Sequence, residues 1–169
     1  MPEYIEKLRV TVRVSRPGEP VVEGALSLSH HSASHGGPET LLELLDPPAG
    51  FIPFERAVDE AVLLFSRPDI QWVMAGPEVA PELVRPRTFR FTREERVRVR
   101  LRGGEELEGL LQMELPENIN RASDYLNGPE RFFPLTTRHG VFLVQKAAVR
   151  EIRLFHSSPL PVPGAADDG

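Results

Sequence analysis

Arginine and phenylalanine alternate in one segment near the middle of the chain. Eight arginines lie between Arg85 and Arg102, and Phe89 and Phe91 lie among them. Guanidinium groups bind phosphates and aromatic rings stack on bases, so this pattern is typical of single-stranded nucleic-acid binding. The residues that would make these contacts are Arg87, Phe89, Arg90, Phe91, Arg96 and Arg98. Against this, the whole chain has a net charge of −5, which disfavours a nucleic-acid partner. The alternative interpretation of this segment is an inter-repeat linker and a solvated strand face.

Three of the five histidines lie close together at His30, His31 and His35. Imidazoles bind transition metals, but a metal site also needs further fixed ligands and a second shell of hydrogen bonds. Here the neighbours are serine, alanine and glycine, a composition that favours a surface loop. The sequence leaves open whether these histidines bind metal, and we predict neither a metal nor a cofactor.

The residues of a hydrolytic triad occur at Ser123, Asp124 and His139, but no nucleophile-elbow motif surrounds the serine. Ser123 is better interpreted as the N-cap of a short helix. The pair Gly103-Gly104 is typical of a hairpin turn rather than of a phosphate-binding loop, and the chain contains no cysteine. We therefore predict that the protein is not an enzyme.

Composition describes a chain rich in turns. Hydrophobic residues make up 40% and charged residues 27% of the 169 positions, and there are 17 prolines and 13 glycines. These values favour a folded protein built from many short elements. No apolar run is long enough to span a membrane, and the first residues lack the features of a secretory signal. We expect a cytoplasmic protein without a membrane partner.

The chain repeats itself, which is the most informative feature of the sequence. Five segments recur in the same order: 8–14 with 95–101, 22–26 with 107–111, 44–48 with 125–129, 51–54 with 132–135, and 62–65 with 141–144. Chance resemblance between short strands rich in valine and arginine is the alternative explanation. The repeat divides the chain into a first copy (1–76), a linker rich in proline and arginine (77–94), a second copy (95–156) and a proline-rich tail (157–169) that we expect to be disordered.

Each copy has the alternation of apolar and polar residues that is typical of strands. We expect each copy to open with a hairpin and then to contain a short helical segment and three further short strands. The expected elements after the opening strands are 21–28, a helix at 39–45, 51–56, 61–66 and 70–74 in the first copy, and 106–113, 132–137, 140–145 and 149–155 in the second.

The register of the two hairpins follows from keeping apolar residues on one face. In the first hairpin Val14 should pair with Val22 and Gly24 should face Val12. In the second hairpin, a three-residue loop from Gly103 to Glu105 would pair Leu101 with Leu107 and Val97 with Leu111. It would also pair Arg102 with Glu106 and Arg100 with Glu108, and it would place Gly109 opposite Val99.

The segment 97–111 resembles the opening hairpin of Sm-like small barrels, and 122–127 together with 131–136 resembles an uncharacterised bacterial Sm-like family. The resemblance is best over residues 95–154. It implies an all-β fold of two tandem Sm-like or SH3-like small barrels with about five strands each. It also implies association through strand edges, in which such proteins join barrels into rings. The RNA-binding loop pattern of Sm-like proteins, an Asp followed by Met-Asn, is absent here.

Together these observations predict a non-enzymatic protein–protein interaction or assembly module in a bacterial cytoplasm. A nucleic-acid-binding protein that uses residues 85–102 is the alternative, followed by an accessory subunit of an enzyme. The partner, or a second copy, should bind at free strand edges drawn from 140–145, 149–155 and their first-copy equivalents. The tail is either a docking peptide or inert. The candidate interface residues are Phe133, Phe142, Val144, Tyr125 and Asn127.

Overall fold

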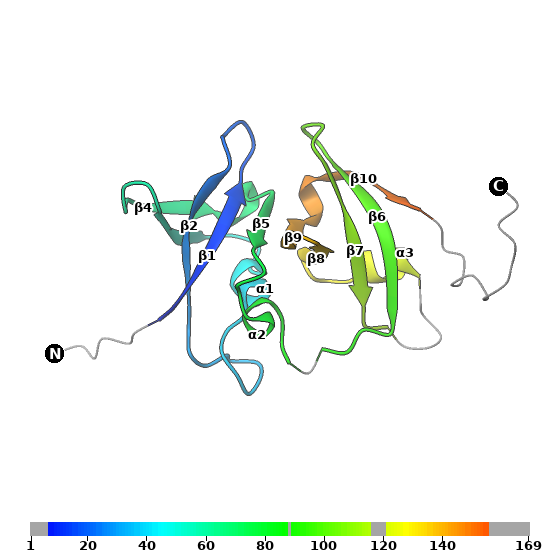
Figure 1. The fold of residues 1–169 in the computed structure, drawn as a ribbon, viewed down its shortest axis with the longest axis horizontal. Helices are drawn as coiled ribbons and strands as arrows, with labels where there is room; N and C mark the ends of the chain where they lie inside the picture. The colour runs from blue at the N-terminus through cyan, green and yellow to red at the C-terminus, as the bar shows by residue number, and fades with distance from the viewer. Residues whose placement is uncertain (1–6, 88, 116–120, 156–169) are drawn as a thin grey trace, which may run out of the picture.

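The computed structural model describes residues 7–155 except 88 and 116–120. These residues form ten strands that belong to one antiparallel sheet, together with three short α-helices and two 3-10 helices (Figure 1). In chain order the elements are β1 (Leu8–Ser15), β2 (Val22–Leu28), α1 (Leu41–Leu45), β3 (Phe51–Arg56), β4 (Val62–Ser66), η1 (Arg67–Asp69), β5 (Trp72–Ala75), α2 (Pro81–Val84), β6 (Arg93–Leu101), β7 (Glu106–Met113), α3 (Ala122–Leu126), β8 (Phe132–Thr137), β9 (Gly140–Gln145), η2 (Lys146–Ala148) and β10 (Val149–Leu154).

One strand order occurs twice in the sheet. The complete order is β10-β6-β7-β8-β9-β5-β1-β2-β3-β4, so β1–β5 and β6–β10 are arranged in the same way. We call these halves the first unit and the second unit. Neither unit closes on itself, because β5 pairs with β9 of the second unit instead of β4. The prediction of a mostly β protein is confirmed, but the strands form one continuous open sheet and not two closed barrels.

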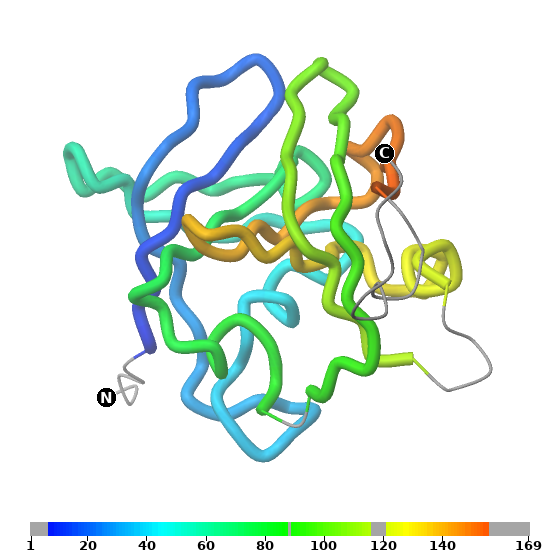
Figure 2. Tube along the Cα trace, turned by 45° about the vertical axis from the view of Figure 1, so that its right-hand side comes forward, coloured from blue at the N-terminus to red at the C-terminus, as the bar shows by residue number. Residues whose placement is uncertain are grey.

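The two units meet in the middle of the molecule (Figure 1). The hairpins β1–β2 and β6–β7 extend side by side from the junction in both views (Figures 1 and 2). The strands β4 and β10 are the two ends of the sheet order and lie at opposite sides of the molecule. Within the described residues, no helix is long and apolar enough to cross a membrane.

Each unit has its own hydrophobic core, and the junction strands contribute to both. On β5, Val73 belongs to the first core and Trp72 to the second. On β9, Leu143 belongs to the first core and Val144 to the second. This follows from the alternation of side chains along a strand, and it confirms that the apolar run from Val141 to Val144 is covered on both faces. The prediction that strand 140–145 is a free edge is wrong, because β9 is paired on both sides.

The adjacent phenylalanines of β8 point to opposite faces, as the sequence predicts. Phe132 packs in the first core although it belongs to the second unit, and Phe133 packs in the second core. Both are buried. Neighbouring side chains of a strand cannot share a face, so this pair links the two cores across one layer of backbone.

The first hairpin has the predicted register, with Val14 opposite Val22 and Gly24 opposite Val12. The second does not. The observed pairs are Val99 with Leu107 and Val97 with Gly109, so the strands are shifted by two residues from the prediction.

The turn explains this difference. The loop runs from Arg102 to Gly104, and Gly104 at its last position has φ of 96°. A three-residue hairpin loop needs a left-handed residue there, which glycine supplies and Glu105 would not. In the observed register Arg100 faces Glu106 and Arg98 faces Glu108, and the predicted pairs Arg100–Glu108 and Arg102–Glu106 do not form.

Short helical segments complete the units. Thr40 caps α1 through its side chain, and Glu43 completes a capping box, so the helix begins two residues after the predicted start. The prediction of Ser123 as an N-cap is wrong: Arg121 is the N-cap residue, and Ser123 lies inside α3. The predicted linker 77–94 contains α2 and the start of β6, and Val84 of α2 packs in the first core. The predicted tail 157–169 lies outside the described residues.

Candidate protein-binding face

The outer face of β3 and β4 exposes large apolar side chains. Phe51, Val62 and Leu64 are 65%, 65% and 64% exposed. The register of the two strands places Pro53 beside Leu64, and Pro53 is exposed as well. We call these four residues the β3–β4 face. Exposed apolar groups that cluster in this way mark an interaction surface in a soluble protein.

The face lies beside a free strand edge. Among the described strands β4 pairs only with β3, so the outward N–H and C=O groups of β4 have no strand partner. An apolar face next to unpaired backbone groups can bind an incoming strand by both hydrogen bonds and side-chain burial.

The matching positions in the second unit are covered. The pairs Pro53–Leu64 and Pro134–Leu143 occupy the same place in β3–β4 and β8–β9. Phe132 and Leu143, which correspond to Phe51 and Leu64, are only 3% and 0% exposed. The first unit covers them, since both pack in its core. One surface therefore occurs twice in the molecule, once buried and once open.

The junction between β5 and β9 shows how such a face is covered. Four antiparallel pairs join the strands, from Trp72 with Val144 to Ala75 with Val141. The rings of Trp72 and Phe142 meet edge to face, with centroids 4.9 Å apart. The buried Gln145 amide donates hydrogen bonds to the carbonyls of η1 and the residue after it, Arg67, Pro68 and Ile70. The junction therefore combines strand pairing, aromatic packing and a buried polar anchor.

The other end of the sheet has a different surface chemistry. Among the described strands β10 pairs only with β6, and Glu151, Arg153 and Leu154 are exposed. The carboxylate of Glu151 lies 3.1 Å from the guanidinium of Arg100. Both free ends of the sheet can accept a strand, but β4 is apolar and β10 is charged.

Carboxylates accompany most of the arginines of the predicted nucleic-acid segment. Arg96 donates to Glu108, and Arg98 lies 3.6 Å from the same carboxylate and 4.0 Å from Glu106. The hydrogen bond from Arg96 is the main reason that the pKa of Glu108 is lowered. Arg87 donates to Glu82. These pairs reduce the positive field that phosphate binding would need.

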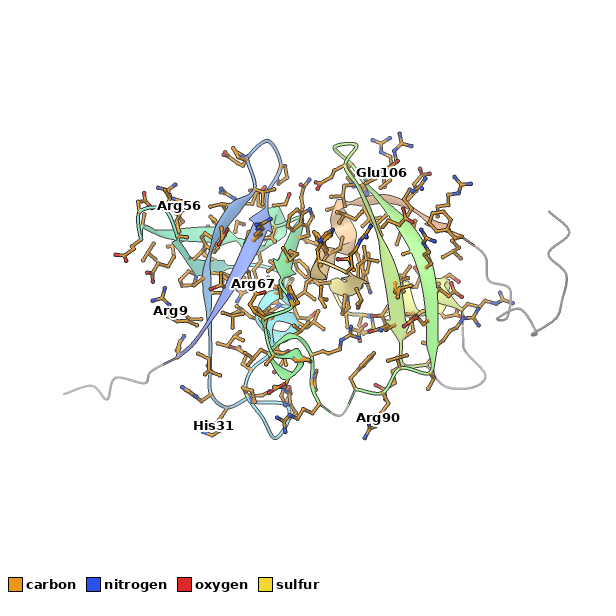
Figure 3. All side chains as sticks on the ribbon, in the orientation of Figure 1. Arg9, His31, Arg56, Arg67, Arg90 and Glu106 are labelled. Atoms are coloured by element: carbon orange, nitrogen blue, oxygen red, sulfur yellow. The ribbon has the colours of Figure 1, made fainter. Side chains whose placement is uncertain are left out.

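The aromatic residues of this segment are divided between two environments. The guanidinium of Arg85 lies over the ring of Phe89, 4.3 Å from its centroid. Phe91 is exposed, and Arg90 extends from the chain between the units (Figure 3). Arg90 and Phe91 are therefore the neighbouring arginine and phenylalanine of this segment that are both exposed.

The predicted interface residues lie in several environments. Phe133 and Val144 are buried in the second core, and Phe142 contacts Trp72 within the chain. Tyr125 is partly buried, and Asn127, the C-cap of α3, is exposed. The three β8–β9 residues therefore lie at or next to the junction inside the chain. Strand 61–66 was among the predicted binding edges, but the predicted interface residues did not include the β3–β4 face. The apolar run from Val62 to Phe65, which matches the run from Val141 to Val144, could have indicated it.

Tyr125 and Arg85 line a cavity of about 330 Å³ between the units. Burial raises the pKa of Tyr125 and lowers that of Arg85. The Nη1 group of Arg85 is buried without a hydrogen-bond partner. Carboxylates of both units, including Asp46 and Glu130, lie around the same space.

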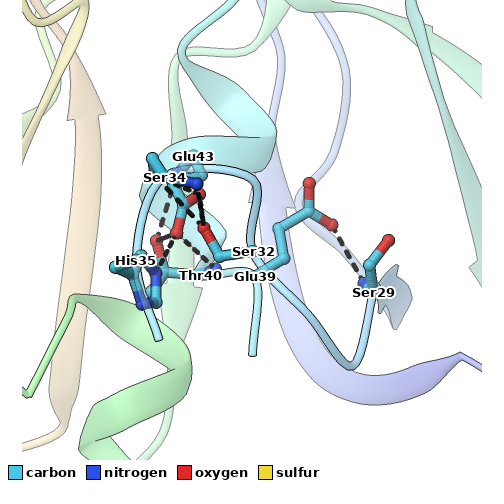
Figure 4. A network of polar contacts seen from close by, with 7 residues as sticks. All are labelled: Ser29, Ser32, Ser34, His35, Glu39, Thr40 and Glu43. Atoms are coloured by element: carbon cyan, nitrogen blue, oxygen red, sulfur yellow. Dashed lines mark hydrogen bonds and ion pairs between the residues drawn. The ribbon is translucent and has the colours of Figure 1, made fainter. Parts of the chain in front are cut away.

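Of the clustered histidines, His35 belongs to a hydrogen-bond network, and His30 and His31 are exposed. His35, Ser32 and Ser34 contact the carboxylate of Glu43 on α1 (Figure 4). Burial alone would raise the pKa of Glu43. The hydrogen bonds from Ser32, His35 and Ser34 together have a larger, opposite effect, so the pKa of Glu43 is lowered. His31 extends outward from the loop (Figure 3). Among the described residues, no three histidine or acidic side chains are placed to hold a metal ion.

The residues of the hypothetical triad belong to separate elements. Ser123 and Asp124 lie on α3, and His139 lies in the turn between β8 and β9.

Comparison of the chain with models of protein families, with curated proteins and with solved structures gives no match.

Proposed function

We propose that the protein is a non-enzymatic protein–protein interaction or assembly module that receives a strand from another protein chain at the edge of β4. The observation that carries this proposal is the contrast between Phe51 and Leu64, which are open, and Phe132 and Leu143, which are buried in matching positions. In the second unit this type of face binds β5. The β3–β4 face should bind a strand in the same way.

Two further observations support the proposal. The strand order β5-β1-β2-β3-β4 recurs as β10-β6-β7-β8-β9, in agreement with the repeat in the sequence and with a resemblance to tandem Sm-like small barrels. Strand addition at an edge derives affinity from backbone hydrogen bonds and specificity from alternate side chains. At β4 those side chains are Val62 and Leu64 on one face and Leu63 and Phe65 on the other.

A peptide that corresponds to residues 69–76, which contain β5, tests the proposal. Added to the full-length protein, it should produce saturable changes in the backbone amide NMR signals of residues 62–66. Replacing Leu64→Lys on the β3–β4 face should abolish these changes. Val58→Lys, at an exposed site in the turn beside the face, is the matched control and should leave them intact.

The same protein samples decide between this function and nucleic-acid binding. Filter binding of single-stranded RNA and DNA at two salt concentrations should show no retention. The nucleic-acid alternative would replace the proposal under two conditions. Retention must fall steeply with salt and disappear in an Arg90→Glu variant, and the NMR signals of residues 62–66 must stay unchanged when the β5 peptide is added.

A further inference from the structure

The two free ends of the sheet match each other in the way that the two strands of the internal junction do. We infer that the strand that pairs with β4 is β10 of a second copy of this chain, joined head to tail in the register of the β5–β9 junction. This inference rests on the proposed function, because it names the partner of the β4 edge.

The internal junction fixes the register. Val73 on β5 faces Val14 on β1, and Ile152 on β10 faces Val99 on β6. Gly24 pairs with Val12 and the matching Gly109 pairs with Val97, so in the structure Val14 is equivalent to Val99 and Arg16 to Leu101, two residues away from the sequence alignment of 8–14 with 95–101. The strands β5 and β10 therefore correspond, with Trp72 equivalent to Glu151. In the same way, Phe65 on β4 is equivalent to Val144 on β9, since each faces the second residue of its partner strand.

Transfer of the observed pairs to the free ends gives a specific set of contacts between copies. Trp72 faces Val144 and Val73 faces Leu143 in the junction. The corresponding pairs between two copies are Glu151 with Phe65, Ile152 with Leu64, Arg153 with Leu63, and Leu154 with Val62. In this register the exposed Leu64 is covered by the second core of the neighbouring copy, as Leu143 is covered by the first core within the chain.

Charge complementarity supports β10 as the partner. In the internal junction Trp72, Leu101 and Val144 lie together in the second core. The three equivalent positions between copies are Glu151, Arg16 and Phe65. The guanidinium of Arg16 lies over the ring of Phe65, 4.1 Å from its centroid, and its Nε is buried without a hydrogen-bond partner.

An incoming Glu151 would supply the acceptor that Arg16 lacks. The positions that hold Trp72 and Leu101 in the second core would thus hold an acid and a base at the contact between copies. A symmetric β4–β4 pair offers no such acceptor, because residues 62–66 contain no carboxylate. The geometry is head to tail, so each copy uses one β4 edge and one β10 edge, and assemblies larger than dimers follow.

Charge reversal tests the pairing. The full-length wild type should associate with increasing concentration into multiples of 18.9 kDa in sedimentation equilibrium. Arg16→Glu and Glu151→Arg should each weaken this association by at least about tenfold, because each places like charges at the contact. An equimolar mixture of the two variants should associate again, since the carboxylate introduced in one variant then meets the guanidinium introduced in the other. Glu23→Arg, which removes an exposed pair with Arg13 in the middle of the sheet, is the matched control.

Cysteine cross-linking tests the register in a chain that has no cysteine of its own. Ile152→Cys combined with Leu64→Cys should give disulfide-linked oligomers under mild oxidation. Ile152→Cys combined with Leu63→Cys should not, because Leu63 points to the other face of β4. Thermal unfolding of every variant confirms that it is folded.

The outcomes separate this inference from the proposed function. The Glu151→Arg variant leaves the β4 edge intact, so the β5 peptide is added to this variant and its binding is measured. If it binds the peptide while the wild type stays at 18.9 kDa at every concentration, the inference is overturned and the proposed function stands. If it fails to bind the peptide, the proposed function fails. A dimer that is insensitive to both charge reversals would overturn the head-to-tail pairing.

Discussion

Glu43 connects the histidine loop to the first core. Its carboxylate accepts from Ser32, Ser34 and the backbone N–H of Thr40, and it contacts His35. Loop and helix are therefore held together by one ionised group, and α1 in turn buries Leu41 and Leu45. A loop rich in serine and glycine is ordered here by a partner that lies eleven or fewer residues further along the chain.

The lowered pKa of Glu43 predicts a pH dependence of stability. Its pKa is lowered from 4.5, so the carboxylate stabilises the fold fully above that pH and loses this effect as the pH falls through the lowered value. Glu43→Gln should cost about 1 kcal/mol at neutral pH, the usual effect of a weakened helix cap. The difference between variant and wild type should shrink below about pH 4. Urea unfolding across this range measures it, and Glu105→Gln, at an exposed turn residue, should match the wild type throughout.

Phe132 and Phe51 occupy equivalent positions in the two units but differ in burial. Phe132→Ala should lower the free energy of unfolding by about 3–5 kcal/mol, because it opens a cavity in the first core. Phe51→Ala should change it by less than about 0.5 kcal/mol in the dilute protein, because that ring is exposed. Chemical denaturation at low concentration measures both. Equal effects would show that the β3–β4 face is covered within the chain.

The sequence predicted the opposite orientations of Phe132 and Phe133 because alternation is a local property of a strand. It did not predict which phenylalanine of the molecule stays exposed. Phe51 and Phe132 have similar neighbours in sequence, and only the pairing of β9 with β5 distinguishes them. That pairing joins residues about 70 positions apart, and no local pattern records it.

At the scale of elements, two glycines allow β2 and β7 to approach the next strand closely. A Cβ on Gly24 would overlap the carbonyl oxygen of Glu55, and one on Gly109 would lie 2.6 Å from that of Thr136. Both contacts are with backbone, which cannot move aside cheaply. The glycines are therefore required where the second strand of each unit closely approaches the third.

Gly24→Ala and Gly109→Ala should each destabilise the protein by about 1–3 kcal/mol or more, as overpacked sites do. Gly103→Ala is the control, because a Cβ there meets nothing within 4 Å. Thermal unfolding of the three variants measures the difference. A Gly109→Ala variant as stable as Gly103→Ala would contradict the observed close approach.

Element bounds were predictable where apolar runs end at turns, as they do for β3, β8 and β9. The register of the second hairpin was not, because a shift of two residues leaves every side chain on the same face. Only the requirement for a left-handed residue at Gly104 separates the two registers. The start of α3 was misplaced for a similar reason: Ser123 is a good capping residue by type, but the helix begins before it.

At the scale of the whole molecule, the units are joined by strand pairing as well as by the chain. Trypsin should cut first at exposed arginines of the connecting segment, Arg87 or Arg90. The two halves should nevertheless elute together under native conditions, because the β5–β9 junction and the shared cores hold them. Urea should separate them. Earlier cleavage at Arg13 or Arg100 would contradict the division into two units.

The covalent connection between the two units has a consequence for the order of assembly. It keeps β5 and β9 at an effective concentration in the millimolar range or above, whereas two free ends on different molecules meet only at the protein's own concentration. The apolar joint at Trp72 therefore forms once, during folding, and stays closed on dilution. The proposed joint at Glu151 between two copies should instead open and close with concentration and salt. In the assembly that we propose, one strand-pairing geometry would supply both a permanent joint and an exchangeable one.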